Sequence, residues 1–298
     1  MISAYAQTRE AIAYYQWGAL HRDAHLMLCM HSYGLNSSEF DRTNSSLVHD
    51  GITSIGFDVP GHGKSPFTAA QMDVDYEAAT ICGQLHDNPL LNDRPLTLMG
   101  HCMGGLTAIR TARKLLEEGY DHLRSLIILT IGANIPRGIP RTDQQSREFL
   151  ESHLCRETAS YVDFSEMDGC SLGTIQKAAF RNTDARTLEY FAQNRHQRLH
   201  DDIEHISAAG IPVLFVAAAM DPLVSTKEIT CAATNGTPPA LYHYANGDMH
   251  HHSGSGPRRV IVADQASHYF PCRRPQILTD IIRLNGDFLR LPEKKHNI

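Results

Sequence analysis

The chain has 298 residues, of which 42% are hydrophobic and 20% are charged, and its formal net charge is −6. A chain of this length can bury a substantial core without disulfide or metal staples. The negative charge argues against a broad nucleic-acid-binding face, because phosphate binding needs a basic surface. No apolar run approaches the length of a membrane span, and the N-terminus lacks a charged-then-apolar signal pattern, so we expect a cytoplasmic protein.

Short apolar runs alternate with helix-favouring segments along most of the chain. The predicted strands are, in chain order, residues 11–17, 26–30, 52–57, 96–99, 125–131, 212–218 and 259–263. The predicted helices are residues 37–49, 74–86 and 106–118, a helix that begins with the capping box at 225–228, and residues 276–289. This alternation is typical of an α/β fold with a mostly parallel sheet and helices on both faces.

The alternation stops between residues 134 and 205. Pro136 and Pro140 break the chain there, and the polar, helix-favouring segments that follow have no strand between them. We therefore predict a helical lid, or cap, at residues 134–205. It would be inserted into a core domain formed by residues 1–133 and 206–298.

The cysteines are odd in number and irregularly spaced, and no Cys-x-x-Cys pair occurs. This pattern indicates neither a zinc site nor a thioredoxin-like motif, and we predict no metal and no cofactor. Most of these thiols are expected to be small core residues in a reducing compartment. The seven are Cys29, Cys82, Cys102, Cys155, Cys170, Cys231 and Cys272.

One cysteine lies in a setting that favours nucleophilic chemistry. The strand at 96–99 continues into Gly100-His101-Cys102-Met103-Gly104-Gly105 and then into a helix. A nucleophile on a sharp strand-to-helix turn needs neighbours without side chains two residues before and two residues after it. At a helix N-terminus the dipole and the free N–H groups favour the thiolate. We predict that Cys102 is a nucleophile and that the Met103 N–H is an oxyanion donor.

These features resemble the α/β-hydrolase superfamily over nearly the whole chain, with cysteine in place of serine in the Gly-x-Ser-x-Gly motif. The segment His31-Ser32-Tyr33-Gly34 resembles the family's oxyanion loop, with Ser32 where glycine is common, and the resemblance makes the Tyr33 N–H the second donor. The run from Asp58 to Ser65 resembles a turn that is usually structural in the family. Dienelactone hydrolases, polyhydroxyalkanoate synthases and Dieckmann cyclases use such a cysteine, and no second motif selects one of them.

The resemblance also implies the other two members of a catalytic triad. Asp221 follows a late strand in a sequence that resembles the family's acid turn, and His268 follows the last strand and precedes a helix. The chain order nucleophile, acid, base is the one that the family uses. We expect Asp221 to orient His268, and His268 to be the base.

The competing base lies in the triplet His250-His251-His252, which is followed only by a Ser/Gly tract. We expect this triplet to lie in a solvated loop, within an insertion at residues 235–258 near the mouth of the site. His101 adjoins the nucleophile, and its side chain is expected to point away from the cleft. Cys272 could approach the site as a redox partner, but simple packing is the favoured interpretation.

The expected reaction is acyl transfer from an ester, thioester or lactone through an acyl-thioester on Cys102. With water as acceptor the enzyme is a hydrolase, the favoured reading; with an alcohol, amine or carbanion it is an acyltransferase or cyclase. The expected substrate is a small acyl compound, free or carried by coenzyme A or acyl carrier protein. A non-catalytic binding or redox-sensing protein is the alternative from another class. The sequence does not identify the acyl chain, the acceptor or the oligomeric state.

Overall fold

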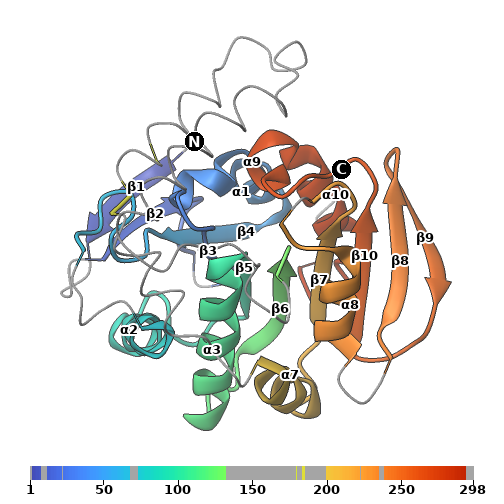
Figure 1. Cartoon of the computed structure of the whole chain (residues 1–298). Coiled ribbons are helices and arrows are strands. Elements are labelled where there is room, and N and C mark those ends of the chain that lie inside the picture. The colour runs from blue at the N-terminus through green and yellow to red at the C-terminus, as the bar shows by residue number, and fades with distance from the viewer. Residues whose placement is uncertain are drawn as a thin grey trace, which may run out of the picture.

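The computed structural model describes residues 2–7, 12–21, 23–67, 73–131, 179, 183–184, 199–221, 223–234 and 238–292. Within these ranges ten strands form one sheet in the order β1-β2-β4-β3-β5-β6-β7-β10-β8-β9 (Figure 1). Neighbouring strands are parallel, except in the pairs β1–β2, β2–β4 and β8–β9. The strands are β1 (Ile2–Gln7), β2 (Ala13–Trp17), β3 (His25–Met30), β4 (Ile52–Phe57), β5 (Leu96–His101), β6 (Leu123–Leu129), β7 (Val213–Ala218), β8 (Ala240–Ala245), β9 (Asp248–Ser253) and β10 (Arg258–Ala263).

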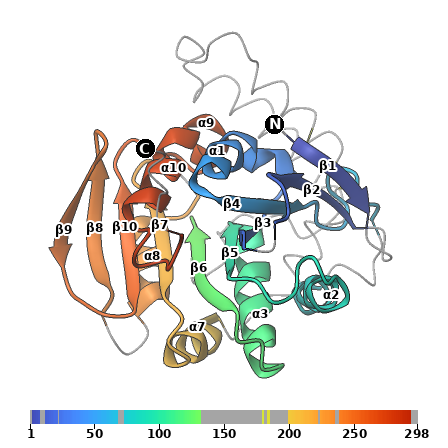
Figure 2. The ribbon, with the colours of Figure 1, turned by 180° about the vertical axis from the view of Figure 1, so that it is seen from behind.

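Helices cover both faces of the sheet, as Figures 1 and 2 show from opposite sides. One layer holds α2 (Val74–Asp87), α3 (Met103–Glu117), α7 (Leu199–Ala208) and α8 (Thr226–Thr234), in which α3 packs against α2, α7, β5 and β6. The other layer holds α1 (Asp41–Leu47), α9 (Phe270–Arg273) and α10 (Pro275–Leu284), which pack against one another. Two short 3₁₀ turns, η1 (Ser37–Phe40) and η2 (Val48–Asp50), flank α1.

The two layers explain why the central strands β3, β4, β5 and β7 are buried along their whole length. Successive side chains of a strand point to opposite faces. Leu26 and Leu28 of β3 belong to the core beneath α2 and α3, whereas Met27 and Cys29 belong to the core beneath α1 and α10. All six residues of β3 are buried, as expected for a parallel strand that helices cover on both sides.

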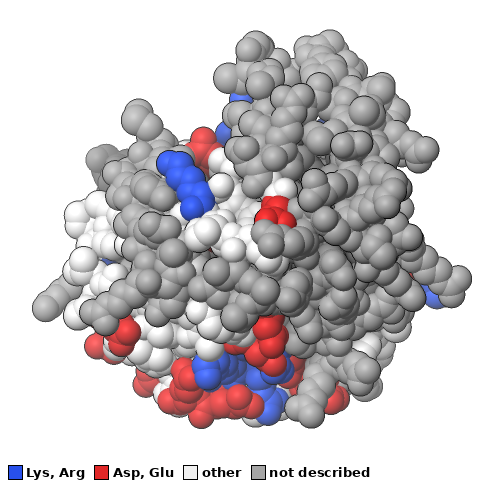
Figure 3. All heavy atoms as spheres, turned by 60° about the vertical axis from the view of Figure 1, so that its left-hand side comes forward, with Lys and Arg blue, Asp and Glu red and all other residues white. Residues whose placement is uncertain are grey.

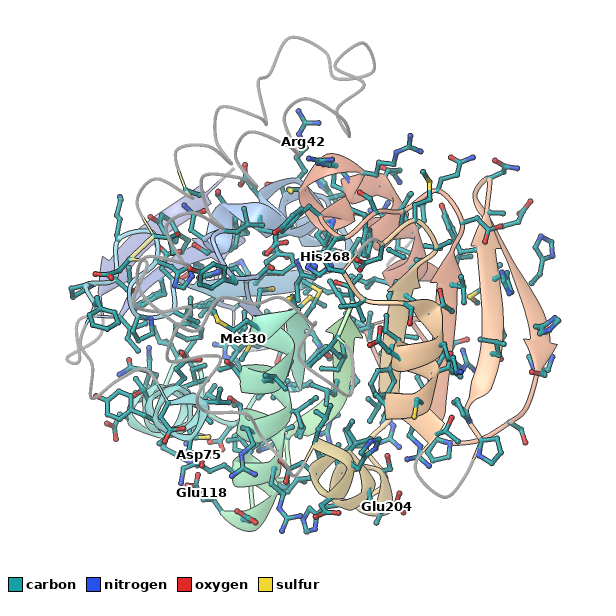
Figure 4. All side chains as sticks on the ribbon, viewed as in Figure 1. Met30, Arg42, Asp75, Glu118, Glu204 and His268 are labelled. Atoms are coloured by element: carbon teal, nitrogen blue, oxygen red, sulfur yellow. The ribbon has the colours of Figure 1, made fainter. Side chains whose placement is uncertain are left out.

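The structure corrects the prediction for residues 235–258. The histidine triplet does not lie in a loop: it forms part of β9, which pairs with β8 in a hairpin. Nor does the hairpin lie near the site, because β8 and β9 extend the sheet beyond β10 to its outer edge, while His268 lies near the middle of the molecule (Figures 1 and 4). Strand β1 was not predicted either.

The proposed lid at residues 134–205 lies almost entirely outside the described residues. Its boundaries therefore stay a prediction. Helix α7 spans the expected boundary at residue 205. No described helix combines the length and hydropathy that a membrane span needs.

Candidate active site

Cys102 occupies a sharp turn between β5 and α3. Its backbone angles are φ 51° and ψ −115°, a left-handed region that residues with a side chain rarely adopt. A Cβ atom on Gly100 would lie 2.2 Å from the Gly104 carbonyl oxygen, and one on Gly104 would lie 2.2 Å from the Met30 carbonyl oxygen. Both contacts are with backbone, so only glycine fits at either position. The predicted strained turn is present, and Cys102 is partly exposed.

His268 and Asp221 meet beside this turn. The Nδ1–H of His268 donates to the Asp221 Oδ2 over 2.8 Å, and both side chains are buried. The other carboxylate oxygen, Oδ1, accepts the backbone N–H groups of Leu223 at 2.8 Å and Val224 at 3.0 Å. These bonds fix the carboxylate, which in turn fixes the imidazole and leaves Nε2 available.

The second imidazole nitrogen of His268 is directed toward Cys102. Burial disfavours the charged imidazolium, but the electrostatic interaction with Cys102 and hydrogen bonds with Asp221 and Cys102 together raise the pKa of His268 well above its usual range. Residues 102, 221 and 268, which are far apart in the sequence, therefore come together in space.

The candidate oxyanion donors lie on two segments that touch. The close approach of Gly104 to the carbonyl oxygens of Met30 and His31 brings the start of α3 against the end of β3. Met103 is the first residue of α3, so its N–H has no acceptor within the helix. Tyr33 follows β3 by three residues and is buried. The convergence of the Met103 and Tyr33 N–H groups on one point stays a prediction.

The loop that carries Tyr33 is held by a neutral histidine. His31 is fully buried, and burial lowers its pKa. Its Nε2 accepts the N–H of Val59 at 3.0 Å, so Nδ1 carries the proton and donates to the Ser32 carbonyl oxygen at 2.8 Å. The loop after β3 is thus tied to the loop after β4.

The turn after β4 has the structural role that the resemblance implies. The Asp58 carboxylate is buried, and its Oδ1 accepts both the N–H of Ser37 at 2.8 Å and the hydroxyl of Ser37 at 2.6 Å. Its Oδ2 accepts the N–H of Lys64 at 3.0 Å. Gly63, at φ 55°, leaves room for that carboxylate, because a Cβ there would lie 2.2 Å from Asp58 Oδ2.

Comparison with known proteins agrees with the fold described above. A family model described as alpha/beta hydrolase fold matches residues 25–153. The enol-lactonase from Burkholderia xenovorans superimposes with a TM-score of 0.71 at 18% identity, covering 96% of this chain and 100% of that one. A thermophilic esterase from Thermogutta terrifontis gives 0.68 at 17% identity, covering 96% and 99%. The chain has the α/β-hydrolase fold.

A third neighbour with this fold, the thioesterase domain from the curacin biosynthetic pathway, superimposes with a TM-score of 0.62 at 14% identity, covering 94% of this chain and 98% of that one. No curated protein matches the sequence. At identities this low the neighbours establish the α/β-hydrolase fold and leave the activity to be argued from the site.

Other candidates from the sequence do not join this α/β-hydrolase site. The side chains of His250, His251 and His252 are exposed on β9 at the far edge of the sheet. The Cys272 thiol is buried and donates to the Tyr269 carbonyl oxygen at 3.2 Å. No three His, Cys, Asp or Glu side chains in the described part of the chain are grouped so as to hold a metal ion.

Two buried polar residues lie beside His268. The sequence analysis named His101 only as a residue that points away from the cleft, and it did not name Glu39. His101 is fully buried, and its ring packs on the His268 ring with centroids 5.0 Å apart. Its Nδ1 is hydrogen-bonded to Glu39, a buried residue of η1 that lies 62 positions away in sequence. The Gly-x-Cys-x-Gly motif marks His101 only as a spacer, and no motif marks Glu39. Only the folded chain shows that they are partners.

Charged groups of both signs mix at the end of the molecule where α2, α3 and α7 lie, on the face that Figure 3 shows. Arg110 of α3 pairs with Asp75 at 2.6 Å and with Asp202 of α7 at 2.7 Å. Figure 4 places Asp75 and Glu118 at this lower end and His268 well above it, over the N-terminal end of α3. The ion pairs thus connect helices of one layer, away from His268.

Proposed function

We propose that the chain is an acyl-transfer enzyme that hydrolyses an ester, thioester or lactone through an acyl-thioester on Cys102. The observation that carries this proposal is the strained Cys102 turn beside an imidazole that Asp221 orients at 2.8 Å. The fold neighbours support the substrate class, because their names are those of an enol-lactonase, an esterase and a thioesterase domain.

In the proposed first half-reaction the Cys102 thiolate attacks the carbonyl carbon while His268 holds the proton from the thiol. The Met103 and Tyr33 N–H groups stabilise the oxyanion of the tetrahedral intermediate. The intermediate collapses, the imidazolium protonates the departing alcohol or thiol, and the acyl group stays on sulfur. Asp221 keeps the imidazole in one tautomer and stabilises its charged form.

In the second half-reaction His268 removes a proton from water, which attacks the thioester and releases the carboxylic acid. An alcohol, an amine or a carbanion in place of water would make the same site an acyltransferase or a cyclase. Assays with added amine and alcohol acceptors separate these reactions, since transfer yields an amide or ester rather than the free acid.

The test is turnover of a panel of short-chain p-nitrophenyl esters, aryl thioesters and lactones by the wild-type chain and by Cys102→Ala. We expect Cys102→Ala to lose roughly 10³-fold or more in kcat/KM, because removing a nucleophile removes the covalent route. Cys231→Ala is the matched control, since Cys231 is an exposed thiol on α8. Turnover that survives in Cys102→Ala would contradict the proposal. Binding of these compounds by wild type without any turnover or adduct would favour a binding protein instead.

A further inference from the structure

A second buried acid–histidine pair lies directly behind the proposed triad. Glu39 and His101 have side chains with 0% exposure, and the His101 Nδ1 is hydrogen-bonded to the Glu39 Oε1. The other oxygen, Oε2, accepts the backbone N–H of Ser32 at 2.9 Å. One carboxylate therefore joins the strand that ends at the nucleophile to the loop that carries the candidate oxyanion donor.

The carboxylate is held from its own side as well. Glu39 lies in η1, whose N-cap Asn36 accepts the N–H of Ser38 at 3.1 Å. The first residue of η1, Ser37, is anchored twice on the buried Asp58 carboxylate. The position of Glu39 is thus fixed by the structural turn after β4, and its two acceptor oxygens are presented in fixed directions.

The bonds around Ser32 determine where the Tyr33 N–H points. The Ser32 carbonyl accepts from His31 Nδ1 at 2.8 Å and from the Leu35 N–H at 3.1 Å. Because a peptide group is planar and trans, fixing this carbonyl also fixes the Tyr33 N–H, which points to the opposite side of the same peptide. Glu39 fixes the preceding peptide through the Ser32 N–H, so the two peptides that lead to Tyr33 are both constrained.

We propose that Glu39, together with His101, positions the oxyanion loop relative to the nucleophile. The proposal rests on the proposed function, since it assigns these residues to the same acyl-transfer site. A buried ionisable pair is not expected to increase the stability of the fold, because apolar residues of similar volume often give equal or higher stability. What apolar residues cannot do is accept the Ser32 N–H, which would otherwise be buried without a partner.

His101 connects Glu39 to His268 of the proposed triad. Its ring lies between Glu39 and His268, tilted by 44° to the His268 ring. Within the described ranges its Nε2 has no hydrogen-bond partner, so the bond to Glu39 is the polar contact that orients the ring. Losing Glu39 would therefore release both the loop at Ser32 and the ring against which His268 packs.

The test compares Glu39→Leu with Glu77→Leu. Glu77 is the matched control, because it is a buried glutamate like Glu39 but contacts Thr107 between α2 and α3 rather than the loop at Ser32. For Glu39→Leu we expect kcat to fall roughly 10- to 100-fold with KM within about threefold, as for a misplaced oxyanion donor. For Glu77→Leu we expect kcat within about twofold of wild type.

A second readout excludes a merely structural role. Iodoacetamide alkylates a thiolate by direct displacement and needs no oxyanion hole, so the alkylation rate of Cys102 should change far less than kcat in Glu39→Leu. Equal losses in both rates, or an unchanged kcat, would overturn the proposal. If Glu39→Leu does not fold, Glu39→Asp replaces it, because the shorter side chain keeps a carboxyl group but cannot reach both Ser32 and His101. The proposed function itself fails by a different result: Cys102→Ala would then turn over substrate as wild type does.

Discussion

Replacing Gly104 with alanine tests whether the turn at Cys102 is held by backbone contact. The added Cβ would lie 2.2 Å from the Met30 carbonyl oxygen and 2.6 Å from that of His31. Contacts below 3.0 Å essentially never occur, so α3 and β3 must separate by at least about 0.8 Å next to the segments that carry the proposed oxyanion donors. A displacement of about that size costs up to about 100-fold in rate. Overpacking of this kind also costs about 1–3 kcal/mol of stability.

The assay is ester turnover together with thermal unfolding, and Gly105→Ala is the control on the adjacent residue. A Cβ on Gly105 meets its nearest neighbour, the terminal methyl of Ile131, at 3.3 Å, and that flexible side chain can move. We expect kcat of Gly104→Ala to fall 10- to 100-fold, because the segments that carry the proposed oxyanion donors would be displaced. We expect kcat of Gly105→Ala to stay near that of wild type. Equal behaviour of the two variants would refute the packing argument.

Three further substitutions follow from the structure. Asp221→Asn removes the carboxylate that orients His268 and should lower kcat by roughly 10³–10⁴-fold, measured by turnover; wild-type kcat would contradict the triad. Burial raises the pKa of Glu77 from 4.5 to about 7, so the carboxyl group is deprotonated at lower pH in the unfolded chain than in the folded one. The free energy of unfolding of wild type should therefore fall as pH rises from about 4.5 to 7. Glu77→Gln has no such group, and its free energy of unfolding, measured in urea, should rise by up to about 3 kcal/mol relative to wild type between pH 5 and pH 8; a difference that does not change with pH would refute the shift. Gly83→Ala, where a Cβ in α2 meets nothing within 4 Å, should raise stability by about 0.5–1 kcal/mol; a lower unfolding midpoint would count against it.

The sequence predicted the interior of the fold well, because buried strands and helix caps leave local signals. Residues 52–57 form β4 with the predicted bounds. The capping box is present, since the Ser225 N–H donates to Glu228 at 2.8 Å and the Glu228 N–H to the Ser225 hydroxyl at 3.2 Å. Strand β9 was missed because Asp248–Ser253 is polar and mostly exposed, and its one apolar residue, Met249, makes no alternating pattern that would mark a buried face.

The arrangement around Cys102 was predictable only in part. The sharp turn at Cys102 could be predicted because it needs glycine neighbours, which are visible in the sequence, whereas Asp221 and His268 were named from the resemblance to α/β hydrolases. The link from Glu39 to His101 and Ser32 was not predictable, because it depends on η1 folding back over the end of β5. Such tertiary contacts leave no periodicity or motif in the sequence.

Trapping the covalent intermediate tests the account most directly. The wild-type chain is mixed with a turned-over ester, quenched in acid within milliseconds and analysed by intact-mass and peptide mass spectrometry. We expect one acyl group, carried by the peptide that contains Cys102, and none in Cys102→Ala. An acyl group on a different residue, or full turnover without any adduct at Cys102, would contradict the account.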